Sequence, residues 1–272
     1  MWLKFTKMHS HGNDVIVIDL ITQEGCVRPD RLAELAHRTL GIGGNQVLFI
    51  EQPDNPEVDF SYQLFDAQGR TIANNDSAAR CLAHYVASQQ LTGKRQLRLG
   101  LKSEQTAVEF VGENHISYEQ IQPELIKHNI ELIADRSKEN LNDLIQNSML
   151  FSYANNEHFL VLRVDSLEKN NLHEPKRFLS KNTRLPLGTQ LVFMQIVHEQ
   201  NIKLRTFNER GKEVFCSGQA AAAALAAGIK KYNLDRKVTV ALHKTQLELQ
   251  WLGNKIKTIG DAHIVFDGRV NI

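Results

Sequence analysis

The chain has 272 residues, a hydrophobic content of 42% and a charged content of 23%, the composition of a globular protein with ample material for a core. Its formal net charge of +1 gives no electrostatic reason to expect a nucleic acid or an anionic membrane as partner. No apolar run approaches the roughly 20 residues that span a bilayer. The amino-terminal segment also lacks the long apolar stretch of a secretory signal, so we expect a cytoplasmic protein.

The cysteine count and the lack of cofactor motifs narrow the chemistry. Cys26, Cys81 and Cys216 are an odd number without metal-ligand spacing, which argues against a disulfide framework and a zinc site. The sequence has no P-loop. A dinucleotide-binding fingerprint has to follow a strand, but Gly41-Ile-Gly43 follows a predicted helix. No lysine is marked for a pyridoxal Schiff base. We therefore expect reduced thiols, no metal and no cofactor.

The hydrophobic pattern predicts strands and helices in a similar order in each half of the chain. The first half reads as strands at 3–8 and 15–19 around a turn at 10–14, a helix at 29–38, strands at 47–50 and 60–65, a helix at 77–90, and two or three antiparallel strands between 96 and 121. The second half reads as a turn at 151–158, strands at 159–164, 190–197 and 202–207, a helix after Cys216, and strands at 238–242, 247–251 and 262–267.

The two halves match at an offset of about half the chain. Aligning Phe65 with Phe207 gives an offset of 142 residues (207 minus 65), which is too long for a solenoid repeat and indicates a duplicated domain. We predict an α/β (α+β) fold with lobes at 1–121 and 122–272, in which the last strand of the chain can cross back to the first lobe. A site of such a fold is expected in the cleft between the lobes, where both halves contribute.

Two helix starts resemble each other but differ in one important position. Phe207-Asn-Glu-Arg-Gly211 is followed by Cys216-Ser217-Gly218 and an alanine-rich run, whereas Phe65-Asp-Ala-Gln-Gly69 is followed by Asn75-Asp76-Ser77. The unpaired N–H groups of a helix start stabilise negative charge, so Cys216 is a candidate thiolate. The alternative is that Cys216 is a small buried apolar residue. Asn75 cannot act as acid or base near neutral pH. Cys81 lies within its helix and is predicted to be core.

Polar residues in the turns provide possible ligand contacts. Glu209 and Arg210 are either a solvated charge pair or a pair in which arginine binds a carboxylate and glutamate an ammonium. Amides in turns commonly close Asx turns, but amides converging on one cleft would suit a small zwitterion. A turn histidine usually faces solvent, but it can also serve a neighbouring thiol as an acid–base partner. The amides are Asn13, Gln46 and Asn156, and the histidines are His11 and His158.

These residues together resemble the diaminopimelate epimerase family along essentially the whole chain. The resemblance implies two similar lobes, each a curled mixed sheet around a central helix, assembled as a homodimer. It also implies pyridoxal-independent isomerisation of an amino acid in lysine biosynthesis, with two cysteines acting on opposite faces of the α-carbon. The motifs that carry it are Phe5-Thr-Lys-Met-His9, Gly12-Asn13-Asp14, Leu40-Gly-Ile-Gly43, Gln46, Phe65–Gly69, Ala79-Arg80-Cys81, Asn156 with His158, Phe193-Met-Gln195, Glu209-Arg210-Gly211, Cys216 and Phe266-Asp267-Gly268.

The departures from the family pattern concern the site itself. By the resemblance, Asn75 occupies the position of one catalytic cysteine, and Asp76 occupies the position of the glycine that follows it. Cys216 occupies the position of the second catalytic cysteine, and His158 is a further candidate catalytic residue. Asp76 would place its own carboxylate where the family binds that of the substrate. The remaining predicted ligand-binding positions are Asn13, Gln46, Asp66, Ser77, Asn156, Gln190, Glu209, Arg210, Ser217 and Gly218, of which Asp66 and Gln190 replace asparagines.

Three functions are compatible with this pattern. The first is an amino-acid epimerase that works through Cys216 with reduced activity. The second is a one-base enzyme, such as a dehydratase or a double-bond isomerase, in which reaction at one face suffices. The third is a non-catalytic relative that binds an amino acid or regulates a partner protein. We expect a small amino-acid-like ligand and a homodimer as partners in each case.

Overall fold

A computed structural model describes residues 1–25, 27–53, 55–101, 104–112, 114–128, 148–153, 156–167, 175–182, 184–242 and 245–272. The chain folds into two compact units. The first combines residues 1–119 with 258–272, and the second contains residues 120–257. Cys26 lies outside the described residues. None of the described helices is long and apolar enough to cross a membrane.

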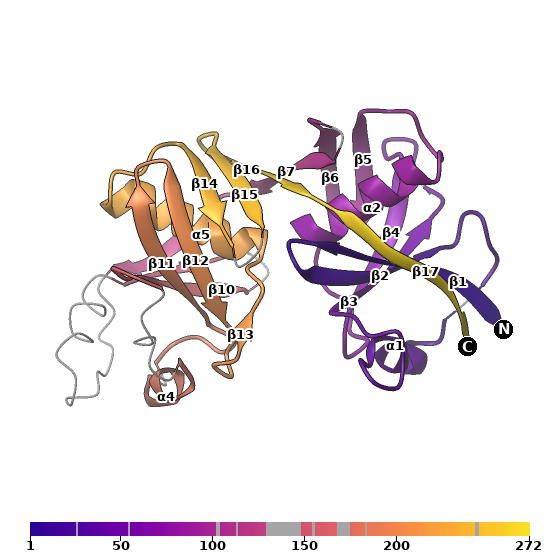
Figure 1. Ribbon diagram of the computed structural model, residues 1–272, viewed down its shortest axis with the longest axis horizontal. Coiled ribbons are helices and arrows are strands. Elements are labelled where there is room, and N and C mark those ends of the chain that lie inside the picture. The colour runs from indigo at the N-terminus through magenta and orange to yellow at the C-terminus, as the bar shows by residue number, and fades with distance from the viewer. Residues whose placement is uncertain are drawn as a thin grey trace. The chain divides into compact units, whose positions relative to one another are not determined.

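The first unit is built from a mixed sheet and two helices (Figure 1). Its amino-terminal strand pairs with the carboxy-terminal strand, so the two ends of the chain are neighbours in one sheet. Its elements are β1 (Trp2–Ser10), β2 (Asn13–Asp19), α1 (Pro29–Ala36), β3 (Gln46–Glu51), β4 (Phe60–Asp66), α2 (Asp76–Ser88), β5 (Gln96–Leu101), β6 (Glu104–Phe110), most of β7 (His115–Ile121), the end of β16 (Lys255–Asp261) and β17 (His263–Asn271).

The second unit contains the remaining elements of the described residues. They are β8 (Glu124–His128), β9 (Met149–Ser152), β10 (His158–Arg163), α4 (Pro175–Lys181), β11 (Gln190–His198), β12 (Asn201–Phe207), β13 (Glu213–Val214), α5 (Gly218–Lys231), β14 (Lys237–Ala241) and β15 (Gln246–Trp251). The strands β7 and β16 pair with each other, and each passes from one unit to the other.

Strand pairing follows the same order in both units. Along β1-β2-β3-β4-β5-β6 the pairs are antiparallel, parallel, antiparallel, parallel and antiparallel. Along β9-β10-β11-β12-β14-β15 the senses are the same. A mixed sheet with one order of senses repeated twice confirms the predicted duplication and the predicted α+β class.

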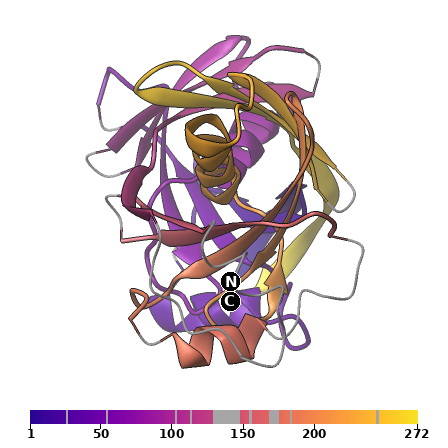
Figure 2. The same ribbon diagram turned by 90° about the vertical axis from the view of Figure 1, so that its left-hand side faces the viewer.

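Each unit packs its sheet around one buried helix. In the first unit, buried residues from β1 through β7 surround α2, whose Ala78, Ala79, Cys81 and Leu82 expose none of their surface. In the second unit, the residues 220–227 of α5 are buried on all sides, and Figure 2 shows α5 within the curve of the strands. A helix such as α5 that is apolar on every side has to be buried on every side. In α2, Cys81 is part of the core, as predicted.

The structure differs from the sequence prediction at several elements. The strand β16 and the helix α4 are not predicted by the pattern, and β9 (Met149–Ser152) ends inside the segment 151–158 where a turn is expected. His158 is the first residue of β10 rather than a turn residue. His11 lies in the β1–β2 turn as predicted, but only 4% of its surface is exposed, so it is not the solvent-facing side chain that is usual for a turn histidine.

Candidate functional site

The turns that lead from β4 into α2 and from β12 into α5 have the same hydrogen bonds, shifted by 142 residues. The glycine of each turn has positive φ, 76° at Gly69 and 71° at Gly211, which favours glycine because any Cβ would be strained there. In the first turn, Asp66 N–H donates to Arg70 O at 2.9 Å and Gly69 N–H donates to Asp66 O at 2.9 Å. In the second turn, Asn208 N–H donates to Lys212 O at 2.9 Å and Gly211 N–H donates to Asn208 O at 2.8 Å.

The same offset continues into the helix caps. The side-chain oxygen of Asn75 accepts the N–H of Ala78 at 3.0 Å, and that of Ser217 accepts the N–H of Ala220 at 3.1 Å. Asn75 is the N-cap of α2 and Ser217 is the N-cap of α5. Pairing Asn75 with Cys216 is therefore wrong by one residue. The structural equivalent of Asn75 is Ser217, and the equivalent of Cys216 is Asn74.

Cys216 precedes the cap of α5 and lies against its core. The residue exposes 8% of its surface and belongs to the cluster of apolar side chains around α5. Its Sγ lies 3.4 Å from the carbonyl oxygen of Ser217, to which the thiol donates. A carbonyl oxygen beside the sulfur suits a protonated thiol, because it can only accept a hydrogen bond. These contacts favour the alternative in which Cys216 is a buried residue.

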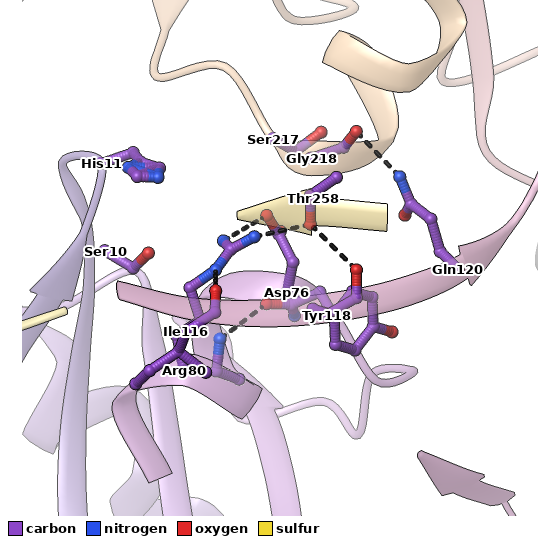
Figure 3. A network of polar contacts seen from close by, with 12 residues as sticks. Ser10, His11, Asp76, Arg80, Ile116, Tyr118, Gln120, Ser217, Gly218 and Thr258 are labelled. Atoms are coloured by element: carbon purple, nitrogen blue, oxygen red, sulfur yellow. Dashed lines mark hydrogen bonds and ion pairs between the residues drawn. The ribbon is translucent and has the colours of Figure 1, made fainter. Parts of the chain in front are cut away.

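Asp76 binds a buried arginine in the first unit. Its Oδ2 accepts from Arg80 Nη1 at 2.6 Å, and the side chains expose 5% and 0% respectively. Arg80 also donates from Nη2 to Thr258 Oγ1 at 2.6 Å and from Nε to the carbonyl oxygen of Ile116 at 3.1 Å (Figure 3). Each nitrogen of the guanidinium group therefore has an acceptor, which a buried charge requires. Ser77, next along α2, is also buried.

Three predicted residues of the first unit lie at one edge of its sheet. Asn13 is the first residue of β2, Gln46 is the first of β3, and Asp66 is the last of β4. Gln46 pairs with Val15 on one side and with Asp66 on the other. The Oε1 of Gln46 is buried without a hydrogen-bond partner among the described residues. Asp66 instead closes its own turn, because Oδ1 accepts the N–H of Arg70 at 2.9 Å and Oδ2 accepts from Nε of the same residue at 2.7 Å.

The corresponding edge of the second unit holds the other predicted residues. Gln190 is the first residue of β11, and its ladder position matches that of Gln46. Asn156 has a φ of 61° just before His158 and β10. Glu209 and Arg210 follow β12; their side chains lie 3.6 Å apart and expose 49% and 86%. At the start of α5, the carbonyl oxygen of Gly218 accepts from Gln120 Nε2 at 3.0 Å (Figure 3).

A pair that sequence reasoning missed lies beside α2 in the first unit. His11 Nδ1 is 3.2 Å from Asp261 Oδ1, and the other carboxylate oxygen lies 2.8 Å from His263 Nε2. Burial and the positive charge of Arg80 lower the pKa of His11 to about 4, so its imidazole is neutral at pH 7. No local signal finds this pair, because 250 residues separate its members (261 minus 11).

No group of three or more metal-ligating side chains capable of holding an ion occurs in the part of the chain that the structure describes.

Comparison with known proteins identifies the family. The fold is shared by solved structures of a phenazine biosynthesis protein of the PhzF family from Bacillus anthracis and a hydroxyproline epimerase from Agrobacterium vitis. The first has a TM-score of 0.73 and 16% identity, and covers 100% of both chains. The second has a TM-score of 0.69 and 10% identity, and covers 99% of this chain and 92% of that one.

Sequence comparison is more specific than the fold. The sequence model of diaminopimelate epimerase matches residues 5–126 and 151–265. The diaminopimelate epimerase of Stutzerimonas stutzeri (strain A1501) is 31% identical over 277 residues, which cover 100% of each chain. The chain belongs to the diaminopimelate epimerase family.

Proposed function

We propose that this chain is an amino-acid-binding member of its family that does not invert a stereocentre with two thiols. One observation carries the proposal: the equivalent N-cap positions of α2 and α5 hold Asn75 and Ser217. Inversion of a carbon centre needs an acid and a base on opposite faces. An amide and an unactivated hydroxyl provide neither near neutral pH. Both side chains are also engaged as helix caps.

The charge next to α2 supports the same proposal. Asp76 places a carboxylate in the first turn of α2, where a helix start favours an anion. An incoming carboxylate would meet this like charge, and Arg80 is already engaged by Asp76. The amides and charges that match the family pattern are kept, namely Asn13, Gln46, Asn156, Glu209 and Arg210. They support a ligand of the amino-acid type, with homodimer assembly and a link to lysine biosynthesis carried over from the family.

A second candidate function rests on Cys216. This thiol lies one residue before the cap of α5, and 8% of the residue is exposed. A single thiol can exchange a proton at one face of a carbon, as a double-bond isomerase or a dehydratase requires. A methylitaconate-delta-isomerase shares the fold with a TM-score of 0.55 and 8% identity.

Incubation with LL-diaminopimelate in deuterated water separates these functions. We expect binding in calorimetry but no α-deuteration and no meso isomer, while a diaminopimelate epimerase of the family produces both in parallel. Deuteration without inversion would favour one-base chemistry, and its loss in Cys216→Ala would assign that chemistry to the thiol. Inversion at the rate of the control enzyme would overturn the proposal.

A further inference from the structure

The carboxylate of Asp14, in β2, connects three segments of the first unit. Its side chain exposes 14% of its surface. Oδ2 accepts from Lys7 Nζ of β1 at 2.6 Å and from Arg38 Nη1 at 3.0 Å. Oδ1 accepts from Arg38 Nη2 at 2.9 Å and from the backbone N–H of Asn45 at 3.0 Å. Each carboxylate oxygen therefore accepts two hydrogen bonds, which fills the acceptor capacity of the group.

The same network holds the loop between α1 and β3. Lys7 Nζ also donates to the carbonyl oxygen of Gly43, and Arg38 Nη2 also donates to Asn45 Oδ1 at 2.9 Å. The backbone carbonyl oxygen of Asp14 accepts the Asn45 N–H as well, at 3.1 Å. Gly43 has a φ of 79°, and a Cβ there would lie 3.0 Å from Cα of Arg38, so the loop is also closely packed. Charged hydrogen bonds, which are stronger than neutral ones, therefore hold this loop against β1 and β2.

Both ends of this connection adjoin an amide of the candidate site. Asn13 directly precedes Asp14, and Gln46 directly follows Asn45. These two amides are the first residues of β2 and β3, which pair with each other. The Oε1 of Gln46 is buried without a hydrogen-bond partner among the described residues, so no bond at that atom fixes the side chain. Its place therefore depends on packing and on the backbone at the start of β3.

We propose that Asp14 is a positioning residue, whose carboxylate fixes the backbone at Asn13 and Gln46 and so prepares these amides for the ligand. Asp14 acts through its neighbours, because the protein itself occupies its acceptor positions. Burial raises the pKa of Asp14, but hydrogen bonds with Arg38 and Lys7 outweigh burial and lower it, so the network is charged at neutral pH. A site that is ordered before binding binds more tightly. The inference rests on the proposed function, since it names a residue that shapes the amino-acid site.

Asp59 provides a matched control within the same unit. Its side chain exposes 10% of its surface and accepts from Lys94 Nζ at 2.7 Å and from the N–H of Arg98 at 2.8 Å. It precedes β4, whereas the edge with the candidate amides lies at the opposite end of that strand, beside Asp66. Asp14→Asn and Asp59→Asn therefore remove the same charge from similar networks, but only the first network adjoins the amides.

NMR of the whole chain without ligand tests the positioning directly. In Asp14→Asn we expect the Asn45 N–H to exchange with solvent about tenfold faster, because it loses a charged acceptor. Nitrogen relaxation should also show a more mobile side-chain amide of Gln46, whose signals are assigned by their loss in Gln46→Glu. Asp59→Asn should leave both observables as in wild type. An unchanged Gln46 amide in Asp14→Asn would overturn the proposal, because the network would then hold the loop alone, and so would equal mobility in Asp59→Asn.

Calorimetry with LL-diaminopimelate measures the consequence for binding. We expect Asp14→Asn to weaken binding by about tenfold and Asp59→Asn by less than about twofold. If Asp14→Asn does not fold, Arg38→Gln removes two of the four hydrogen bonds at an exposed side chain and should weaken binding by about threefold, with Arg98→Gln as its control. Equal binding by each variant and its control sinks the inference alone. A wild type that does not bind sinks the proposed function, and the mobility of the Gln46 amide then still decides the inference.

Discussion

Asn75 caps α2 in the same way that Ser217 caps α5. Each side-chain oxygen accepts the N–H three residues later, at 3.0 and 3.1 Å. Replacing either by alanine should lower the free energy of unfolding by about 1 kcal/mol, because an N–H loses its partner. Urea denaturation measures this loss, and Asn75→Ser and Ser217→Thr, which keep an oxygen, serve as controls. An alanine variant as stable as wild type would contradict the capping role.

Asp76 and Asp66 form two Asp–Arg pairs of the same spacing but different burial. The Asp76–Arg80 side chains expose 5% and 0%, whereas those of Asp66 and Arg70 expose 16% and 75%. Asp76→Asn leaves a buried guanidinium without its counter-charge and should destabilise the protein by about 3–5 kcal/mol. Asp66→Asn should cost less than about 1 kcal/mol. If both variants lose a similar free energy of unfolding in urea, burial does not determine how much each pair contributes to stability.

Alkylation should discriminate between the described cysteines. Cys81 is fully buried, and burial raises the pKa of its thiol well above the ordinary range, so it should stay unmodified in the native protein. Cys216 exposes 8% of its surface and should react first. Brief treatment with iodoacetamide at pH 7.5, followed by peptide mass spectrometry, measures the order. Denatured protein, in which both thiols react, is the control, and labelling of Cys81 ahead of Cys216 would contradict the fold of α2.

Restoring inversion should require changes at both helix starts. Asn75→Cys with Asp76→Gly supplies one thiol and removes the like charge, so it should give α-deuteration of diaminopimelate with little inversion. Adding Ser217→Cys supplies the second thiol and should raise inversion by at least tenfold over the double variant.

The informative control for this series is the same double variant combined with Cys216→Ala. It should behave like the double variant, because Cys216 corresponds to Asn74 rather than to Asn75. Full inversion by the double variant that disappears in this control would instead assign catalysis to Cys216. Circular dichroism must show that each variant is folded, since Asp76→Gly leaves Arg80 without Asp76.

Acid should destabilise the protein through His11 before the carboxylates titrate. Burial and Arg80 lower its pKa from 6.5 to about 4, whereas Asp76 and Asp261 oppose the shift and His9 adds to it. The unfolded chain therefore binds a proton that the folded chain rejects, and stability falls as the pH drops from 6.5 to 4. The loss should reach roughly 3 kcal/mol at pH 4.

Urea denaturation at pH 7.5, 5.5 and 4.5 measures this slope. We expect His11→Asn to flatten it and the exposed His115→Asn to leave it unchanged. The histidines His9 and His84 also have lowered pKa values through burial, so a smaller slope should remain in His11→Asn. An unchanged slope in that variant would show that the pKa of His11 is the same in the folded and the unfolded chain.

Local patterns were sufficient to predict the duplication and most of its elements. The turns around Gly69 and Gly211, the flanking strands, the two central helices and the burial of Cys81 follow from residue spacing, because they depend on neighbours a few positions away. The 142-residue offset, applied residue by residue, already places Asn75 on Ser217. Because cysteine is a reactive side chain, from the sequence alone we instead pair Asn75 with Cys216, which is one residue out of this register.

Tertiary structure decided the contacts between distant segments. The helix α5 begins at Gly218 because Ser217 caps it through the hydrogen bond from Ala220 N–H. From the sequence alone we place Cys216 at this helix start instead. The pairing of His11 with Asp261 and of Arg80 with Thr258 depends on β16 returning to the first unit, and the sequence pattern does not predict β16. The sequence by itself determined which repeated elements form and to which family they belong. Only the folded chain set the register and the long-range charge pairs, because both depend on packing between residues far apart in the sequence.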